Sequence, residues 1–461
     1  MKILVTIGPV SESYPSLKKI AKYTNLFRIN GSHNTLNWHK IVSNKIRSVS
    51  TNSKILLDIP GVKPRSLNKN PIKINNNEKL YFSFEKKVNN SKEKIIYLSN
   101  PIPKFKKTNK HLTLCDGLYS FQILKSSNNL IYARSLQQFV LHPAKGLNIA
   151  GSIYSEKLQR KKYLSFLDRA INSKISFDAI GLSFVQNYHL VKFIKLKFKD
   201  KIIISKIENV SGLKNIDSII KYSDIIMIDR GDLGAEIGTE NLYQAIDMIV
   251  SKCKKKAIPV ILATENLNSM ISDSQPSKSD VVNISHLINL NVDTIMLSDE
   301  TALSKNFYKI ILWLSNFLDK SNKISSKILL NKSKYDKNDT ALAHVYNSLP
   351  TSLNNIPIIL FTKKGFFLKN FFNDDKNNTF FIFTSNKKIE KIYDFSNRIQ
   401  IFYTDKFDNK NLNIFIYKQI DLMRKKIFKD FQSALLLYTN YPRKGSRANS
   451  LTFLSKKDFN N

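Results

Sequence analysis

The sequence predicts an α/β fold: a (β/α)8 TIM barrel with an inserted small β-barrel lid domain and a C-terminal α/β domain. Three observations predict this fold: eight short apolar runs, helix-length segments between most of them, and two intervals in which this alternation of runs and segments is interrupted. Strands that lack polar alternation, each followed by a helix-length connection, are typical of a parallel sheet covered on its outer side. Eight such units favour a closed barrel.

The eight strands are expected, in chain order, at residues 3–8, 26–30, 55–59, 178–184, 202–208, 224–232, 258–265 and 293–301. Almost every run becomes polar where it ends, with Arg28 and Asn30, Asp58, Ser183, Lys206 and Glu208, Asp232, Thr264, and Ser298 and Glu300. In a barrel these ends meet at one mouth, where the active sites of this fold are built. Alternate residues of a strand face the same side, so Lys206 and Glu208 should lie together. A surface ion pair would explain one such pair, but not the whole convergent set.

Two intervals interrupt the alternation and predict additional domains. Residues 67–144 carry short β-rich runs with Asn-rich and Lys-rich turns, which indicate an inserted β domain. After residue 330, runs such as IPIILF and NTFFIFTS alternate with helical segments, which indicates an α/β domain with its own sheet. We therefore expect a discontinuous barrel domain (1–66 and 145–330), a lid domain (67–144) and a C-terminal domain (331–461).

The composition bounds the class of protein. The chain has 461 residues, 42% of them hydrophobic, and a formal net charge of +37. Its lysines are scattered among Asn, Ile and Ser, as the codon bias of an AT-rich genome would produce, so we expect no nucleic-acid partner. No long uncharged apolar run and no signal peptide occur, so we expect no membrane partner and a cytoplasmic location. Cys115 and Cys253 lack the spacing of a zinc or redox motif.

Ten short motifs, taken in order, resemble those of the pyruvate kinase family. They are TIGP (6–9), RINGSH (28–33), LLDIPGVKPRS (56–66), DG (116–117), KGLNIAG (145–151), LSFV (182–185), SKIEN (205–209), RGDLGAEI (230–237), ATENLNSM (263–270) and MLSDETA (296–302). One motif alone is weak evidence, whereas ten in family order are specific. The resemblance is strong over the barrel, weak over the insert and faint over about the last 120 residues.

The resemblance implies phosphoryl transfer from phosphoenolpyruvate to ADP, giving pyruvate and ATP. It assigns Mg²⁺ to Glu208 and Asp232, and carboxylate oxygens are ligands that this hard cation prefers. It implies that Lys206 is the catalytic lysine, which would stabilise the charge on the phosphoryl group during its transfer. The substrate-binding residues that it implies are Arg28, Gly231, Asp232, Thr264 and Ser183, and Thr264 would also take part in protonation of the enolate.

The resemblance also implies nucleotide and potassium sites. Nucleotide contacts are expected from Arg65, Lys145, Asn30 and His33, with the inserted domain closing as a lid over ADP. Potassium ligands would be Asn30, Ser32, Asp58 and Ile59. Members of the family that do not need potassium carry Lys at the position of Lys63, so we expect Lys63 to replace the ion. The family suggests a homotetramer.

The chain departs from the family pattern at several positions. Asp229, Glu265 and Asp299 are extra carboxylates near the expected mouth, and they could perturb metal affinity and neighbouring pKa values. Asn34 stands where the family usually has Gly, and Asn tolerates left-handed backbone geometry. Two alternatives to an active pyruvate kinase remain open at this point: a catalytically degenerate barrel kept as a binding or scaffold protein, and a related barrel enzyme that uses magnesium and an enolate.

Overall fold

The computed structural model describes residues 1–84, 93–106, 108–127, 129–324, 356–362, 379–396, 399–404, 412–429, 431–438 and 450–459. Its centre is a closed barrel of parallel strands in the order β1-β16-β15-β14-β13-β12-β3-β2. These strands are β1 (Lys2–Thr6), β2 (Leu26–Asn30), β3 (Lys54–Ile59), β12 (Ala179–Leu182), β13 (Ile202–Ile207), β14 (Ile225–Asp229), β15 (Val260–Ala263) and β16 (Thr294–Leu297). All eight predicted runs therefore form strands of one barrel.

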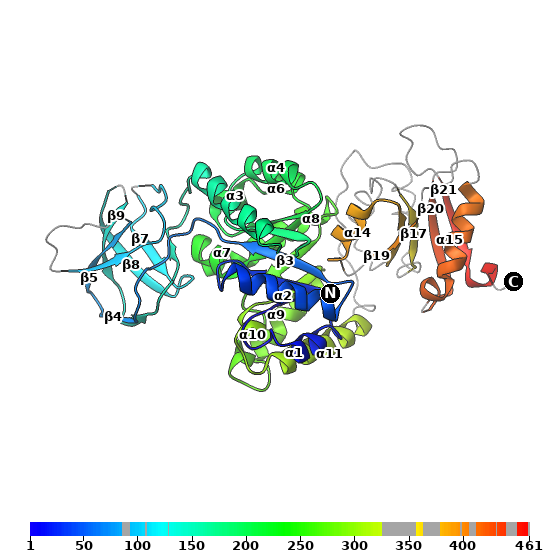
Figure 1. The fold of residues 1–461 in the computed structure, drawn as a ribbon, viewed down its shortest axis with the longest axis horizontal. Helices are drawn as coiled ribbons and strands as arrows, with labels where there is room; N and C mark the ends of the chain where they lie inside the picture. The colour runs from blue at the N-terminus through cyan, green and yellow to red at the C-terminus, as the bar shows by residue number, and fades with distance from the viewer. Residues whose placement is uncertain are drawn as a thin grey trace.

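Helices surround the barrel, as the helix-length connections predict (Figure 1). They are α1 (Tyr14–Ile20), α2 (Leu36–Val49), α3 (Glu156–Asn172), α4 (Tyr188–Lys197), α5 (Val210–Lys214), α6 (Ile216–Tyr222), α7 (Arg230–Ile237), α8 (Leu242–Lys254), α9 (Lys278–Asn289), α10 (Asp299–Ala302) and α11 (Phe307–Ile324), with 3-10 turns at Thr239–Asn241 and Asn268–Ile271. Several begin at a side-chain cap; for example, Thr35 accepts a hydrogen bond from the backbone amide of Trp38. One large apolar core lies between the strands and these helices.

Several predicted strands extend past the observed ends, and those predicted to end at 232 and 301 do so by the most. The run 224–232 stops being a strand at Asp229, and α7 starts at Arg230, so Asp232 lies in the first turn of a helix and not on a strand. Likewise β16 ends at Leu297, and Asp299 opens α10. Acidic residues are favourable in the first turn of a helix, so a polar strand end and a helix start look alike in sequence.

The chain between β3 and α3 forms the all-β part that the pattern predicts, at one side of the barrel (Figure 1). Six strands, β11 (Leu147–Asn148), β7 (His111–Leu114), β8 (Tyr119–Ser127), β9 (Leu130–Ser135), β5 (Lys79–Ser83) and β6 (Lys94–Tyr97), form one sheet in that order. A second sheet pairs β10 (Phe139–Leu141) with β4 (Ile72–Ile74). Both sheets contribute to a single apolar core, which includes Phe82, Phe121 and Phe139.

The C-terminal part forms a five-stranded sheet on the other side of the barrel (Figure 1). Its order is β19 (Ile399–Tyr403), β18 (Phe380–Thr384), β17 (Ile358–Phe361), β20 (Ser433–Tyr438) and β21 (Ser450–Ser455), with β21 antiparallel to β20. Helices α14 (Lys387–Tyr393) and α15 (Leu412–Ile427) and a 3-10 turn at Lys456–Phe459 complete it. The predicted boundary between 330 and 331 lies outside the described residues.

The C-terminal part closes the amino end of the barrel. Phe395, which follows α14, is fully buried in the core inside the barrel, together with Leu4, Ile202 and Met296. Its backbone carbonyl accepts a hydrogen bond of 2.7 Å from the hydroxyl of Thr294. Since one end of the barrel is filled in this way, the charged strand ends face the other mouth, beside the insert.

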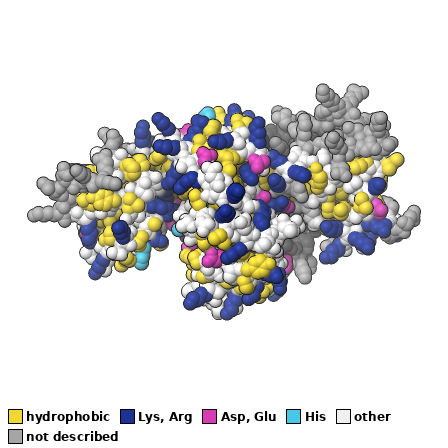
Figure 2. All heavy atoms as spheres, in the orientation of Figure 1, with side chains coloured by type: hydrophobic (Ala, Val, Ile, Leu, Met, Phe, Trp, Pro, Cys, Tyr) yellow, Lys and Arg dark blue, Asp and Glu magenta, His cyan; other side chains and the backbone are white. Residues whose placement is uncertain are grey.

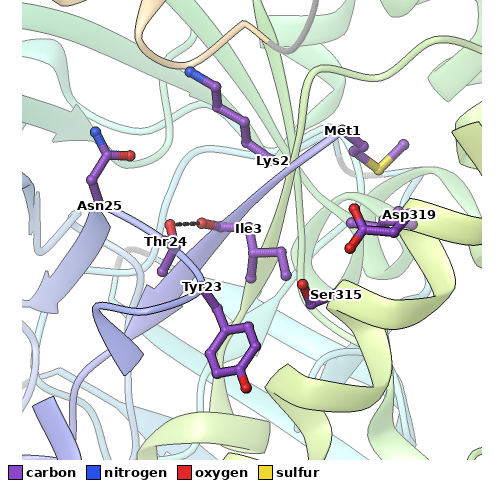
Figure 3. Close-up of a pocket in the computed structure, with 9 residues that line it drawn as sticks. Met1, Lys2, Ile3, Tyr23, Thr24, Asn25, Ser315 and Asp319 are labelled. Carbon is purple, nitrogen blue, oxygen red and sulfur yellow. Dashed lines mark hydrogen bonds between the residues drawn. The ribbon is translucent and has the colours of Figure 1, made fainter. Parts of the chain in front are cut away.

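A cavity of about 240 Å³ lies at the amino end of β1 (Figure 3). It is lined by Met1, Lys2, Ile3, Tyr23, Thr24, Asn25, Ser315, Leu318 and Asp319, and the Thr24 hydroxyl donates to the Ile3 carbonyl at 2.5 Å. It is therefore remote from the charged strand ends. Among the described residues no helix combines the length and the apolarity that crossing a membrane needs. Figure 2 shows Lys and Arg side chains spread over the visible face and not gathered in one stripe.

Candidate active site

The inner face of β13 changes from apolar to charged along the strand. Ile202 and Ile204 face the barrel interior, and the same alternation brings Lys206 to the carboxyl end of that face. The Lys206 ammonium, 5% exposed, contacts three carboxylates: Glu208 at 2.9 Å, Asp58 at 3.2 Å and Asp229 at 3.3 Å. Burial opposes the charged form, yet Asp58, Glu208 and Asp229 hold the pKa of Lys206 well above its usual value. The lysine is thus a buried cation, as phosphoryl-group stabilisation would require.

Asp58, on β3, links Lys206 of β13 to Arg28 of β2. The Arg28 guanidinium contacts Asp58 Oδ2 through Nε at 2.9 Å and through a second nitrogen at 2.8 Å, and it also donates to the Thr6 hydroxyl at 3.1 Å. Burial acts to raise the pKa of Asp58, but the charges of Lys206 and Arg28 outweigh it, so the pKa is lowered. The Ser183 hydroxyl donates to the Ile59 carbonyl at 2.9 Å. Two of the four expected potassium ligands, Asp58 and Ile59, are therefore already engaged by protein donors.

Glu208 is held from two sides. Lys206 faces one of its oxygens, and the backbone amide of Phe184 donates to the other. Phe184 has a φ of 58°, in the left-handed region that is unusual for a bulky residue. Burial is the main cause that raises the pKa of Glu208 to about 8. Because Glu208 is buried and lies near other carboxylates, a bound cation would strongly stabilise its ionised form.

A second ion-pair group lies beside the first. The Lys63 ammonium, 3% exposed, contacts the carboxylate of Asp232 and lies 3.0 Å from Asp116 Oδ1. Burial acts to raise the pKa of Asp232, but the nearby Lys63 ammonium outweighs it, so the pKa is lowered. The amide nitrogen of Asn148 lies 3.5 Å from Asp232 Oδ1. Lys63 thus meets one of the expected magnesium ligands, and no contact joins its ammonium to the expected potassium ligands among the described residues.

Thr264 is held in a strained conformation by three consecutive residues. Its φ is 65° and that of Glu265 is 53°, and a β-branched residue rarely adopts such values. The Arg230 guanidinium donates to the Thr264 carbonyl, Gly231 donates its amide to the Thr264 hydroxyl at 3.1 Å, and that hydroxyl donates to Asp229 Oδ1 at 3.2 Å. The residues at the junction of β14 and α7 therefore hold the Thr264 hydroxyl, a group that the sequence predicted to be functional.

The donor set fits a divalent cation. Glu208, Asp229 and Asp232 each offer a carboxylate oxygen, and these three atoms lie within 4.8 Å of one another. The buried Oδ1 of Asn148 has no hydrogen-bond partner among the described residues. Hard oxygen donors at this spacing are those that Mg²⁺ uses.

Five predicted residues lie apart from this cluster. Arg65 donates to the Ala144 carbonyl at 3.1 Å, and the side chain of Lys145 is exposed. Asn30 Oδ1 accepts from the backbone amide of Ser32 at 3.1 Å, and Ser32 and His33 are exposed. Arg65 and Lys145 flank the insert, since Arg65 pairs with Gly146 in a β-bridge. These residues rim the mouth and stay candidate nucleotide and potassium residues.

Sequence reasoning missed some residues of the site. Arg230 was quoted only as part of a motif, yet it contacts Thr264, Asn266 and Asn283. Of the three extra carboxylates, only Asp229 is buried, at 7% exposure, whereas Glu265 and Asp299 are exposed. Strand alternation separates Asp229 from the other two, because Asp229 continues the inward row of Ile225 and Met227.

Glu236 is a buried carboxyl next to this site, and it gives a pH-dependent prediction. Burial is the main cause that raises its pKa from 4.5 to about 8, and one of its oxygens has no partner among the described residues. Because the native state keeps the proton longer than the unfolded chain, this group lowers stability progressively as pH rises from 4.5 to about 8. Glu236→Gln removes the ionisation.

We expect the advantage of Glu236→Gln over wild type, in free energy of unfolding, to grow by a few kcal/mol, as an order of magnitude, between pH 5 and pH 8. Urea titrations at several pH values measure it. Glu240→Gln, which changes an exposed carboxylate of the same region, serves as the control. Parallel pH curves for wild type and Glu236→Gln would show that Glu236 is ionised in the native state.

The fold and the cluster define a (β/α)8-barrel protein with a buried group of carboxylates, two lysines and an arginine at the carboxyl-end mouth. Residues 1–309 match the family model described as "Pyruvate kinase, barrel domain". The chain belongs to the pyruvate kinase family.

Individual relatives agree with this family. A pyruvate kinase of Trypanoplasma borreli is 30% identical over 326 residues, which cover 68% of this chain and 65% of the relative. One of Thermococcus litoralis is 30% identical over 315 residues, covering 66% of each. The matches thus span slightly less than two thirds of the length of these relatives. A solved structure of a pyruvate kinase from Cryptosporidium parvum has the same fold, with a TM-score of 0.78 and 24% identity over 98% of this chain and 95% of that one.

Proposed function

We propose that the chain transfers the phosphoryl group of phosphoenolpyruvate to ADP, giving pyruvate and ATP, the last step of glycolysis. The observation that carries this proposal is the contact of Lys206 with Glu208 at 2.9 Å, inside a buried cluster at the carboxyl-end mouth of the barrel. In the reaction the bond from phosphorus to the enolate oxygen breaks, and a bond from phosphorus to an ADP oxygen forms. Such a reaction needs positioning and charge neutralisation more than covalent chemistry.

Two cationic side chains meet the phosphoryl group in this proposal. Lys206 stabilises its charge in flight, and Arg28, fixed by Asp58, binds the substrate phosphate. Ser183, whose hydroxyl lies 3.3 Å from Asp58 Oδ1, would line the substrate side of the site. Asp58 holds both cations at one place, which reduces the reorganisation that the transition state would otherwise require.

Glu208 and Asp232 would hold the magnesium ion, which supplies neutralisation of the phosphoryl and enolate oxygens. Asp232 enters from α7 and Glu208 from the end of β13. The backbone amides of Gly231 and Asp232, with the Thr264 hydroxyl, bind the substrate carboxylate. No side chain fills the space at Gly231, where an added Cβ would come no nearer than 3.7 Å to Asp116. The Thr264 hydroxyl also orients the water that delivers a proton to the enolate carbon.

The nucleotide is proposed to bind between the barrel mouth and the insert. Arg65 and Lys145 reach it from the two connections to the insert, and Asn30 and His33 from the end of β2. The division into barrel (1–66 and 145–330), lid (67–144) and C-terminal domain (331–461) is part of this proposal. A lid that closes over ADP excludes water and so prevents hydrolysis of the phosphoryl group.

The proposal extends to monovalent ions and assembly. Asn30, Ser32, Asp58 and Ile59 are the potassium positions, and the charge of Lys63 makes the ion dispensable. A homotetramer in the cytoplasm, without nucleic-acid or membrane partners, is the arrangement that fits the family.

A coupled assay with lactate dehydrogenase tests the function. We expect NADH oxidation that requires phosphoenolpyruvate, ADP and Mg²⁺ together. The degenerate alternative predicts binding of phosphoenolpyruvate, visible as a thermal shift, without turnover. The intact set of Lys206, Glu208, Asp232 and Thr264 favours the enzyme, because a scaffold protein has no need for a buried lysine among carboxylates.

A further inference from the structure

Asp229 adds a carboxylate to a place where the magnesium site already has two. It is the last residue of β14 and is 7% exposed, and its inward position follows from the row of Ile225 and Met227. One of its oxygens lies within 4.8 Å of an oxygen of Glu208 and an oxygen of Asp232. Three carboxylates this close repel one another, and the ammonium groups of Lys206 and Lys63 offset that repulsion only in part.

The charges around the cluster do not balance. Four carboxylates, those of Asp58, Glu208, Asp229 and Asp232, face the cations Arg28, Lys206 and Lys63. The ammonium of Lys63 is also shared with Asp116 at 3.0 Å. With all four carboxylates ionised, the cluster carries one more negative than positive charge, which a bound divalent cation offsets.

A neutral oxygen next to the carboxylates also lacks a partner. The Asn148 side chain is 1% exposed, and its Nδ2 lies 3.5 Å from Asp232 Oδ1. Its Oδ1 accepts no hydrogen bond from any residue that the structure describes. A buried amide oxygen without a donor, on a side chain beside Asp232, is a group that a cation, or a water held by one, would satisfy.

We propose that Asp229 is a third anionic group of the divalent-cation site formed by Glu208 and Asp232, and that it strengthens binding of the cation by the free protein. The place of this site in catalysis rests on the proposed function. Mg²⁺ sites with one or two carboxylates usually depend on substrate phosphates for further ligands. A third carboxylate supplies that oxygen from the protein.

The other contacts of Asp229 are compatible with this role. Its distance to Lys206, 3.3 Å, is the longest of the three lysine contacts, and its Oδ1 accepts from the Thr264 hydroxyl at 3.2 Å. An ionised carboxylate has about four acceptor positions on its two oxygens, so it can keep both partners and still face a cation.

The test is equilibrium binding of Mn²⁺ alone to the full, chelator-treated chain, followed by the electron paramagnetic resonance of free Mn²⁺. Asp229→Asn keeps the shape of the side chain and removes its charge. We expect it to raise the Kd for Mn²⁺ about tenfold or more. Asp224→Asn is the matched control, because Asp224 is a buried aspartate at the other end of β14, paired with Lys195 at 2.8 Å. Its Kd should stay within about twofold of wild type.

The outcomes separate this inference from the proposed function. A Kd for Asp229→Asn within about twofold of wild type overturns the inference, as does wild-type protein that turns over substrates but binds no Mn²⁺ without them. Wild-type protein that binds Mn²⁺ in an Asp229-dependent way without turnover supports the inference and refutes the proposed function. If the Asn variant fails to fold, Asp229→Ala gives the same comparison.

Discussion

Lys206→Met should lower kcat by about a hundredfold or more, with the fold retained. The contact of its ammonium with the phosphoryl group is strongest in the transition state, so the loss should fall on kcat and less on KM. The fold should survive because Asp58 keeps Arg28 as a partner at 2.8 Å, and because Glu208, with its raised pKa, readily takes up a proton. Steady-state kinetics and circular dichroism measure the two effects.

Lys201→Met is the matched control for this variant. Lys201 precedes the same strand at its other end, where it contacts Asp200 at 3.3 Å and the Phe177 carbonyl at 3.0 Å. It should keep close to wild-type kcat. A Lys206→Met enzyme with more than about a tenth of wild-type kcat would show that the lysine has no such role.

Lys63→Glu should create a requirement for potassium. The wild-type ammonium is buried against Asp232 and Asp116, so a carboxylate in its place would leave three negative groups together. Breaking a buried ion pair costs about 3–5 kcal/mol of stability. Because Asp232 is an expected magnesium ligand and loses its partner, we also expect activity to fall by about a hundredfold. In tetramethylammonium buffer we expect an active wild type and a nearly inactive variant that added potassium restores in part.

Lys195→Glu controls for the general cost of breaking a Lys–Asp pair, since Lys195 contacts Asp224 at 2.8 Å at the other end of the barrel. It should not acquire a response to potassium. Wild-type protein that loses most activity without potassium would mean that Lys63 does not replace the ion.

The fold could be predicted because each barrel strand is apolar on both faces and is followed by a helix-length segment. Strand alternation also placed Lys206 and Glu208 together, and their 2.9 Å contact bears out that placement. The ends of the runs were less predictable. Asp232 and Asp299 are polar residues after an apolar run, and nothing in such a pattern separates a strand end from the first turn of α7 or α10.

The remaining parts of the site depend on contacts between distant segments. Lys63 and Asp232 are 169 positions apart, and the loop after β3 that brings them together has no periodic pattern. The left-handed backbone at Phe184 and Thr264 could not be predicted from the sequence either, since neither residue type favours that conformation. At Asn34, by contrast, the residue type indicated a left-handed conformation, and its φ is 61°.

The most direct test of the account follows phosphorus itself. The ³¹P spectrum of wild-type protein with phosphoenolpyruvate, ADP and Mg²⁺ should show the phosphoenolpyruvate signal falling while the γ-phosphate signal of ATP rises in equal amount, and Lys206→Met should leave both almost unchanged. Phosphoenolpyruvate that persists beside folded wild-type protein, or that is lost to inorganic phosphate without formation of ATP, would contradict phosphoryl transfer by this site.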